Sequence, residues 1–299
     1  MNTIDDSPGQ TKTGIAGRLN AWLHPRVMTM LFLGFSAGVP ILLIFSTLSV
    51  WLREAQVSRS AVTFFSWAAL GYSFKFIWAP VIDQMPFPLL TRVLGRRRGW
   101  MLVSQIMVIL AILWMALTDP AAGGGSLTVM ALASVLLGFS SATQDIAIDA
   151  YRIESADESL QALMASVYIA GYRIGMLAAG AGALFIAQIK GSSPETYDYT
   201  AWRTAYQIMA GLMAIGIITV FVIKEPDVTA KEGHHTRTMD HARFFILFLV
   251  SVAAFVGWFY FSSGIASTLK ALVVSVVKNN SAAGFIIETV RLAAGICTG

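Results

Sequence analysis

The chain has 299 residues, of which 56% are hydrophobic and only 13% are charged. Its mean hydropathy of +0.66 is too high for a soluble globular domain, and it lacks the alternating ten-residue pattern of an outer-membrane barrel. The single cysteine, Cys297, excludes an intrachain disulfide. We therefore expect an all-α, multi-pass membrane protein, in which the positions of the charges matter more than the net charge of +4.

Six apolar segments follow a polar N-terminal segment, residues 1–26, and each is long enough to cross a hydrocarbon core about 30 Å thick. They cover residues 27–52, 61–81, 100–117, 127–151, 163–186 and 202–223. A hydrophilic linker, 224–243, follows this unit of 27–223, and residues 244–299 predict additional transmembrane segments. Because the chain stops inside an apolar run, we expect an incomplete, N-terminal portion of a longer protein. The course of residues 262–299 is left open.

The distribution of Lys and Arg predicts the orientation of the segments. Most of these residues lie in the N-terminal segment, in the loops after segments two and four, and in the linker. The loops of the opposite side contain only Arg53, Arg59, Lys190 and Arg203. Because Lys and Arg are retained on the cytoplasmic side, we expect the N-terminus and the Arg96–Arg98 loop to be cytoplasmic.

Glycines spaced four residues apart occur in segments one and five. Gly34 and Gly38 precede Pro40, and Gly171 and Gly175 lie in the fifth segment. This spacing lets two helices approach closely, and a proline inside a transmembrane helix bends it. We interpret all five as packing and kink positions.

The stretch 138–154, GFSSATQDIAIDAYRIE, gives the strongest functional signal. Spacings of four and three place Asp145, Asp149 and Arg152 on one helix face. Ionisable groups within a membrane are costly and usually face a bundle interior, a partner or a water-filled path. Gln144 and Asp145 are therefore candidate site residues. Asp149 and Arg152 lie at the membrane boundary, where charges also serve as anchors.

Two cations lie within other segments. Arg173, beside Tyr172, is near the middle of segment five and beyond the reach of either headgroup layer, which favours a functional role. Lys75 lies about two-thirds of the way through segment two, where it could instead extend its ammonium to the surface. A metal site is not expected, because the linker histidines have no cysteine or carboxylate frame. No catalytic triad, phosphate loop or dinucleotide fingerprint is found, so neither a cofactor nor an enzyme is expected.

Six segments with both ends cytoplasmic and a basic loop after the second resemble one half of a major facilitator transporter, which contains 3+3 inverted repeats. SWAALGYSFKFIWAPVID, LGRRRGW, QDIAIDAYRIE and GVPILLIFSTLSVWLRE are similar to the AmpG muropeptide permease family of Gram-negative bacteria. The resemblance covers about residues 27–225 and is weaker after residue 239. Asp83 with GRRRG is a loose version of the superfamily's loop signature.

The resemblance implies a proton-coupled importer in the bacterial inner membrane. It would carry anhydro-muropeptides (GlcNAc-anhydroMurNAc peptides) from periplasm to cytoplasm for peptidoglycan recycling, with effects on β-lactamase induction and beta-lactam resistance. Arg173 and Lys75 would hold substrate carboxylates beside Gln144 and Tyr172, and Asp145 would exchange the proton. The expected cytoplasmic gate consists of Asp83, Asp149, Arg152, Arg96, Arg97 and Arg98.

Three alternatives remain open at this stage. A transporter of acyl-coenzyme A would share the fold but would need several phosphate-binding cations facing its cavity. An intramembrane transferase could use Asp145 with Asp149 as a base. A non-transporting fragment would only insert into the membrane. The sequence does not predict the muropeptide preference, the coupling stoichiometry or the oligomeric state.

Overall fold

The computed structural model describes residues 22–58, 65, 72–87 and 90–226, together with single residues and short runs between 243 and 290. The chain divides into two units, residues 1–231 and 232–299. The predicted N-terminal segment, the linker and the additional transmembrane segments lie mostly outside the described residues. The description below therefore concerns the first unit.

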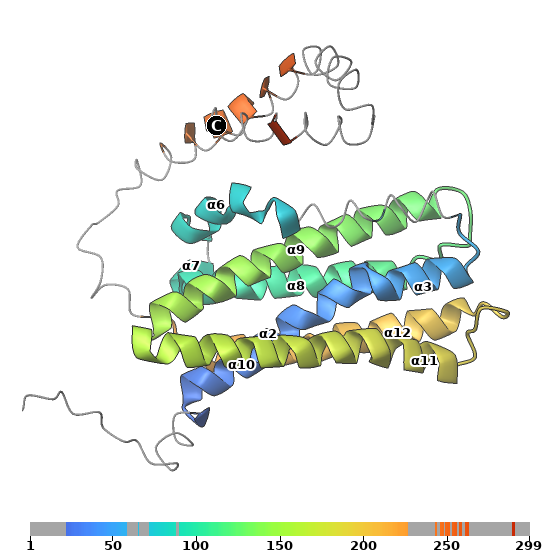
Figure 1. Ribbon diagram of the computed structural model, residues 1–299, viewed down its shortest axis with the longest axis horizontal. Coiled ribbons are helices and arrows are strands. Elements are labelled where there is room, and N and C mark those ends of the chain that lie inside the picture. The colour runs from blue at the N-terminus through green and yellow to red at the C-terminus, as the bar shows by residue number, and fades with distance from the viewer. Residues whose placement is uncertain are drawn as a thin grey trace, which may run out of the picture. The chain divides into compact units, whose positions relative to one another are not determined.

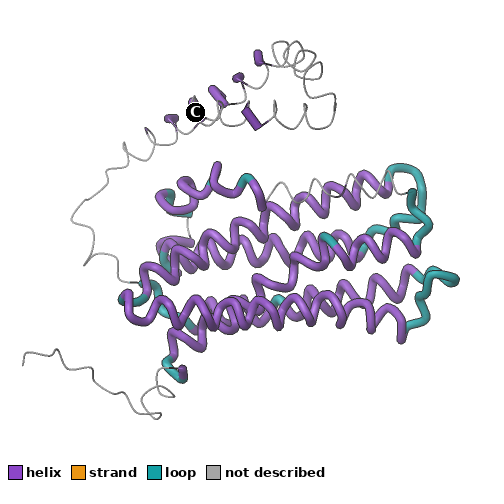
Figure 2. The backbone as a smooth tube through the Cα atoms, in the orientation of Figure 1, coloured by secondary structure: helices purple, strands orange, loops and turns teal. Residues whose placement is uncertain are grey.

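The first unit is a bundle of long helices that run side by side, with most connections at its two ends (Figures 1 and 2). Its main helices are α2 (Pro25–Ile44), α8 (Arg96–Ala116), α9 (Ser126–Ser155), α10 (Glu158–Leu177) and α12 (Tyr199–Leu212). In the described part, five stretches are long and apolar enough to cross a membrane: Pro25–Glu54, Arg96–Ala116, Ser126–Ser155, Ser159–Ile189 and Tyr199–Val222. The predicted all-α membrane fold is confirmed, and these stretches correspond to five of the six predicted segments.

Three of the spanning stretches are interrupted. In the first, α2 ends at Ile44, and α3 (Ser46–Glu54) begins after Phe45, which has a non-helical ψ of −86°. Pro40 lies inside α2, which continues past it to Ile44, so its missing N–H removes one hydrogen bond to the preceding turn but does not set the position of the break. In the fifth segment a π-helical turn, η3 (Ala178–Gly182), separates α10 from α11 (Ala183–Ile189). In the last, α12 is followed by α13 (Ala214–Val222).

The described part of segment two differs from the predicted continuous helix. A 3-10 turn, η2 (Lys75–Ile77), precedes the short helix α6 (Ala79–Gln84). Pro80 lies in the first turn of α6, where its missing N–H costs nothing, but further inside a helix its ring would collide with the preceding turn. The helix therefore restarts at Ala79. A second short helix, α7 (Leu90–Leu94), leads to α8.

Helices α2 and α10 pack with their backbones in contact. A Cβ atom on Gly38 would lie 2.1 Å from the carbonyl oxygen of Tyr172, and one on Gly171 would lie 2.1 Å from that of Leu31. Gly34 and Gly175 meet the opposite backbone at the same close range. Backbone atoms cannot move aside as a side chain can, so these four positions have room only for glycine. This seam fixes α10 against α2.

Candidate functional site

The middle of α9 carries a buried polar layer that faces α2 and α10. Asp145 is 8% exposed, and its Oδ1 accepts a hydrogen bond from the Tyr168 hydroxyl of α10 at 3.3 Å. Gln144 is fully buried, and its Nε2 donates to the Ser36 hydroxyl of α2 at 3.0 Å. Two consecutive polar residues of α9 therefore reach two different helices.

Segment two contacts α9 one turn before this layer. The Tyr72 hydroxyl donates to Ser141 Oγ at 2.7 Å, and Trp78 Nε1 donates to Thr143 Oγ1 at 3.2 Å. These bonds give the polar groups of the four side chains hydrogen-bond partners that their apolar neighbours could not provide. Asp145 consequently lies where α2, α10 and segment two converge on α9.

The structure brings some of the predicted binding residues to Asp145. Lys75 is half-buried in η2, and its charge acts on the Asp145 carboxyl. Tyr172 is half-buried on α10, with its ring 6.1 Å from that of Tyr168. Arg173 is exposed on α10, and its Nη1 lies 3.9 Å from Met176 Sδ. Among the described residues, no carboxylate lies within ion-pair distance of Lys75 or Arg173.

Three of the predicted gate residues, Asp83, Arg96 and Arg97, gather in an ion-pair cluster at one end of the bundle, which we call the arginine end. Arg97 is only 5% exposed and donates from Nε to Glu154 at 2.9 Å and from Nη1 to Asp83 at 2.9 Å. A further Arg97 nitrogen and Arg96 also bond to Glu154. A buried guanidinium is stable only when its donors are satisfied, and here two carboxylates from α6 and α9 satisfy them.

Glu225, which follows α13, caps α8 at the arginine end. Its two carboxylate oxygens accept from the backbone N–H groups of Arg97 at 2.7 Å and Arg98 at 3.0 Å. A carboxylate is favoured there because the first N–H groups of a helix are unpaired and carry partial positive charge. Gly95 allows this approach, because its φ is +91° and a Cβ there would lie 2.3 Å from Glu225 Cδ. Arg98 in turn donates to the carbonyl of Val220 in α13 at 2.9 Å.

Asp149 and Arg152 form a separate ion pair with each other, and Asp149 makes no ion pair with Arg96, Arg97 or Arg98 in the described part of the chain. Arg152 Nη2 lies 3.1 Å from Asp149 Oδ1, and the Asp149 side chain is 46% exposed. The predicted gate is thus divided into two groups. Sequence reasoning missed Glu154, which binds the guanidinium groups of Arg96 and Arg97, and Glu225, which accepts from the backbone N–H groups of Arg97 and Arg98. An acidic residue at the end of an apolar segment, on the same side as an arginine run, is the signal that could have identified them.

The opposite end, which we call the tryptophan end, contains an aromatic network. Trp51 stacks on Trp202 with ring centroids 5.6 Å apart and planes 3° apart. Glu54 accepts from Trp202 Nε1 at 2.7 Å and from the Ser192 hydroxyl at 2.5 Å. Tyr197 accepts from Trp51, and burial raises the pKa of its hydroxyl, which therefore stays a donor. This end joins α3, α12 and the loop between α11 and α12.

Known proteins support the same architecture. Residues 30–296 match the family described as the Major Facilitator Superfamily. The chain is 35% identical over 211 residues to "Putative transporter AmpG 4" of Rickettsia felis, covering 71% of this chain and 48% of that protein. It is 34% identical over 211 residues to the "Anhydromuropeptide permease" of Escherichia coli (strain K12), covering 71% and 40%. It is 35% identical over 229 residues to "Putative transporter AmpG 3" of Rickettsia prowazekii, covering 76% of this chain and 51% of that protein.

The chain spans about half the length of these curated relatives or somewhat less. The resemblance to AmpG proteins seen in the sequence motifs is confirmed by these identities. The match to the superfamily covers most of the chain, and the described helices form the expected multi-pass bundle. This chain belongs to the Major Facilitator Superfamily.

Proposed function

We propose that this chain acts in the proton-driven import of anhydro-muropeptides from the periplasm across the bacterial inner membrane. The observation that carries the proposal is its 34% identity to the anhydromuropeptide permease of Escherichia coli over 211 residues. The superfamily assignment supports a transporter rather than an enzyme. The proposed orientation, with the N-terminus and the arginine end in the cytoplasm, follows from the Lys and Arg distribution.

The substrate end of the proposal rests on Lys75, Tyr172 and Arg173. Muropeptides carry peptide carboxylates, which a guanidinium can bind through two parallel hydrogen bonds and an ammonium as a point charge. Arg173 forms no ion pair with a described residue, so its charge is available to a ligand, and the Lys75 charge becomes available when Asp145 is protonated. Gln144 is buried against Ser36 in this structure, so we propose a substrate contact for it only in a conformation that separates α2 from α9.

The proton-coupling step is assigned to Asp145. When Asp145 is ionised, it attracts the Lys75 ammonium of segment two. Protonation would remove that attraction and free the ammonium for a substrate carboxylate. Proton and substrate would then bind together, as coupled transport requires. Arg96, Arg97 and Arg98 with Asp83, and the separate pair of Asp149 and Arg152, would hold the cytoplasmic gate closed.

Uptake of radiolabelled anhydro-muropeptide into membrane vesicles tests the proposal. We expect accumulation that a protonophore abolishes, with no competition from acyl-coenzyme A. Asp145→Asn should still bind substrate but should not accumulate it against a gradient, whereas the matched control Glu195→Gln should behave as wild type. Lys75→Gln and Arg173→Gln should each weaken binding about tenfold or more, the worth of one charged hydrogen bond. Normal uptake by both cation variants would refute the binding assignment, and unchanged pH dependence in Asp145→Asn would refute the coupling assignment.

A further inference from the structure

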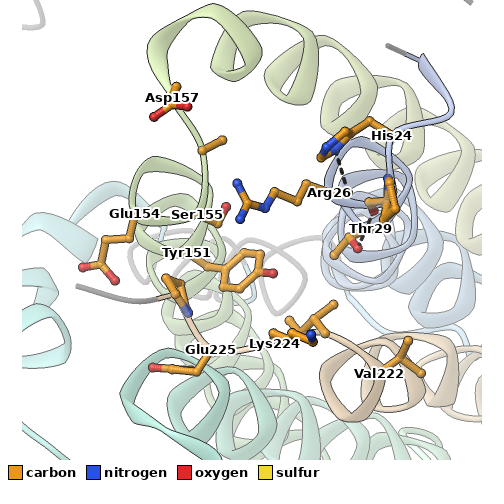
Figure 3. Close-up of a pocket in the computed structure, with 14 residues that line it drawn as sticks. His24, Arg26, Thr29, Tyr151, Glu154, Ser155, Asp157, Val222, Lys224 and Glu225 are labelled. Carbon is orange, nitrogen blue, oxygen red and sulfur yellow. Dashed lines mark hydrogen bonds between the residues drawn. The ribbon is translucent and has the colours of Figure 1, made fainter. Parts of the chain in front are cut away.

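A cavity of about 740 Å³ lies at the arginine end, apart from the polar layer around Asp145. It is formed where α2 begins, where α9 ends and where α13 ends, as Figure 3 shows. The residues that line it belong to three short stretches, His24–Thr29, Tyr151–Asp157 and Val222–Pro226. Its volume is in the range of sites that bind small molecules. The proposed transport mechanism does not use this cavity.

Two of the three carboxylates in the lining are already engaged elsewhere. Glu154 is bonded to Arg96 and Arg97, and Glu225 caps α8. In Figure 3 both side chains point to the same side, away from Arg26. The third, Asp157, is exposed at the rim. Two arginines outside the cavity therefore offset the charge of Glu154, while the Glu225 carboxylate is held by the first N–H groups of α8 and Asp157 stays at the rim.

The cations of the lining are not neutralised. Neither the Arg26 guanidinium nor the Lys224 ammonium forms an ion pair with any residue that the structure describes. Arg26 extends toward the middle of the cavity beside the Tyr151 ring, and Lys224 lies on the other side of that ring in this view (Figure 3). Tyr151 adds a hydroxyl donor from α9. Three donors from three elements thus converge on one space, which favours an anion.

A phosphate is the anion that suits these donors. A guanidinium bonds two phosphate oxygens at once, and an ammonium and a hydroxyl can satisfy the remainder. The cavity lies where three apolar helices end, which is the depth of lipid headgroups. Exposed apolar residues adjoin the lining in the chain, since Trp22 and Leu23 directly precede His24 and Val222 itself lines the cavity, and tryptophan is typical of the membrane interface.

We propose that this cavity binds the phosphate of an anionic phospholipid headgroup through Arg26, Lys224 and Tyr151. The acyl chains would leave the cavity along Trp22, Leu23 and Val222. Basic pockets between transmembrane helices on the cytoplasmic side are known to bind headgroups of this charge. The inference is independent of the transported substrate, since it concerns an end of the bundle rather than its middle.

Native mass spectrometry of the purified chain tests this inference. The protein is equilibrated with equal amounts of phosphatidylglycerol and phosphatidylcholine, and the retained lipids are counted. We expect preferential retention of one phosphatidylglycerol. The double variant Arg26→Gln/Lys224→Gln should lose about fivefold in affinity for each cation removed. The control Lys190→Gln/Arg203→Gln changes the same two residue types at exposed positions of the tryptophan end and should keep the preference.

Two further variants and one competitor sharpen the test. Asp157→Asn should tighten phosphatidylglycerol binding, because it removes the remaining rim carboxylate, and Tyr151→Phe should weaken it less than the double variant does. Equal retention of both lipids by the wild type, or an unchanged preference in the double variant, would overturn the inference. Displacement by millimolar inorganic phosphate without any lipid preference would also overturn the lipid assignment, because it would identify a soluble phosphate as the ligand.

Discussion

At the arginine end, Arg97 lies between Glu154 and Asp83, whereas at the tryptophan end Trp51 stacks on Trp202 above Glu54. The first arrangement uses full charges on both sides of each contact. The second pairs two carboxylates, Glu54 and Asp119, with neutral donors and adds a large apolar contact. Both ends connect helices that are distant in the chain. The two ends should therefore differ in how much stability each loses when one of its groups is removed.

A buried ion pair fails when one member is removed, because the remaining charge stays in a poor solvent. When neutral groups donate to a carboxylate and that carboxylate is replaced by an amide, the network keeps most of its hydrogen bonds and all of its packing. The arginine end should therefore be sensitive to single charge changes and the tryptophan end tolerant of them. A join of the first kind suits a gate that must open, and a join of the second kind suits a fixed support.

The largest expected effect comes from the seam that connects the two ends. In Gly171→Ala the new Cβ would collide with the Leu31 carbonyl, so α2 and α10 must separate and both ends should lose their order together. We expect a destabilisation beyond about 5 kcal/mol and loss of the monodisperse peak in size-exclusion chromatography. The control Gly211→Ala has open space at its Cβ and should elute as wild type. Equal elution of the two variants would show that the seam is not close-packed.

The next effect compares equivalent changes at the two ends. Glu154→Gln should cost about 3 kcal/mol, since Arg97 would keep only Asp83 as a charged partner. Glu54→Gln should cost about 1 kcal/mol, because the amide oxygen can still accept from Trp202. Thermal unfolding of the purified variants in one detergent measures both. Similar losses of stability in Glu154→Gln and Glu54→Gln would show that the two ends are equally sensitive to the removal of a charge.

The smallest expected effect is at Asp198, which caps α12 at the tryptophan end. Hydrogen bonds from the Thr200 side chain and backbone lower the pKa of Asp198 from 3.8. Because the folded pKa is below the unfolded one, this stabilisation is present above about pH 4 and is lost as the pH falls through the folded value. Asp198→Ala should cost about 1 kcal/mol at neutral pH, and Asp198→Asn much less, since Asn also caps helices. A difference between Asp198→Ala and wild type that persists undiminished at pH 2.5 would contradict this assignment.

The sequence predicted the helices well because their signal is local. Long apolar runs mark spans, and glycines four apart mark the faces that touch, as Gly38 and Gly171 do. The helix break before Pro80 was also readable from the proline, although we expected a continuous segment there. Element type and approximate position therefore follow from composition and spacing.

Side-chain pairing did not follow from the sequence, because it depends on how distant segments meet. Asp149 and Glu154 are both acidic and lie on the same helix, yet only Glu154 reaches Arg97. Gln144 and Asp145 are neighbours in the chain but face different helices, a difference of one helical step that hydrophobicity cannot reveal in a membrane. The partners Ser36 and Tyr168 carry no charge and gave no signal.

The π-helical turn at Ala178–Gly182 changes the direction in which the later side chains of the fifth span point. A π turn accommodates one extra residue, so every side chain beyond it is rotated by about 100° relative to an uninterrupted α-helix. A single helical wheel drawn through α10 and α11 consequently assigns the wrong face to the residues after Gly182. Deleting one residue within the turn would restore the α-helical period and rotate Ala183, Phe185 and Ala187 together. The buried residues of α11, Ala183 and Ala187, face the neighbouring helices only because the π-helical turn rotates them into that position.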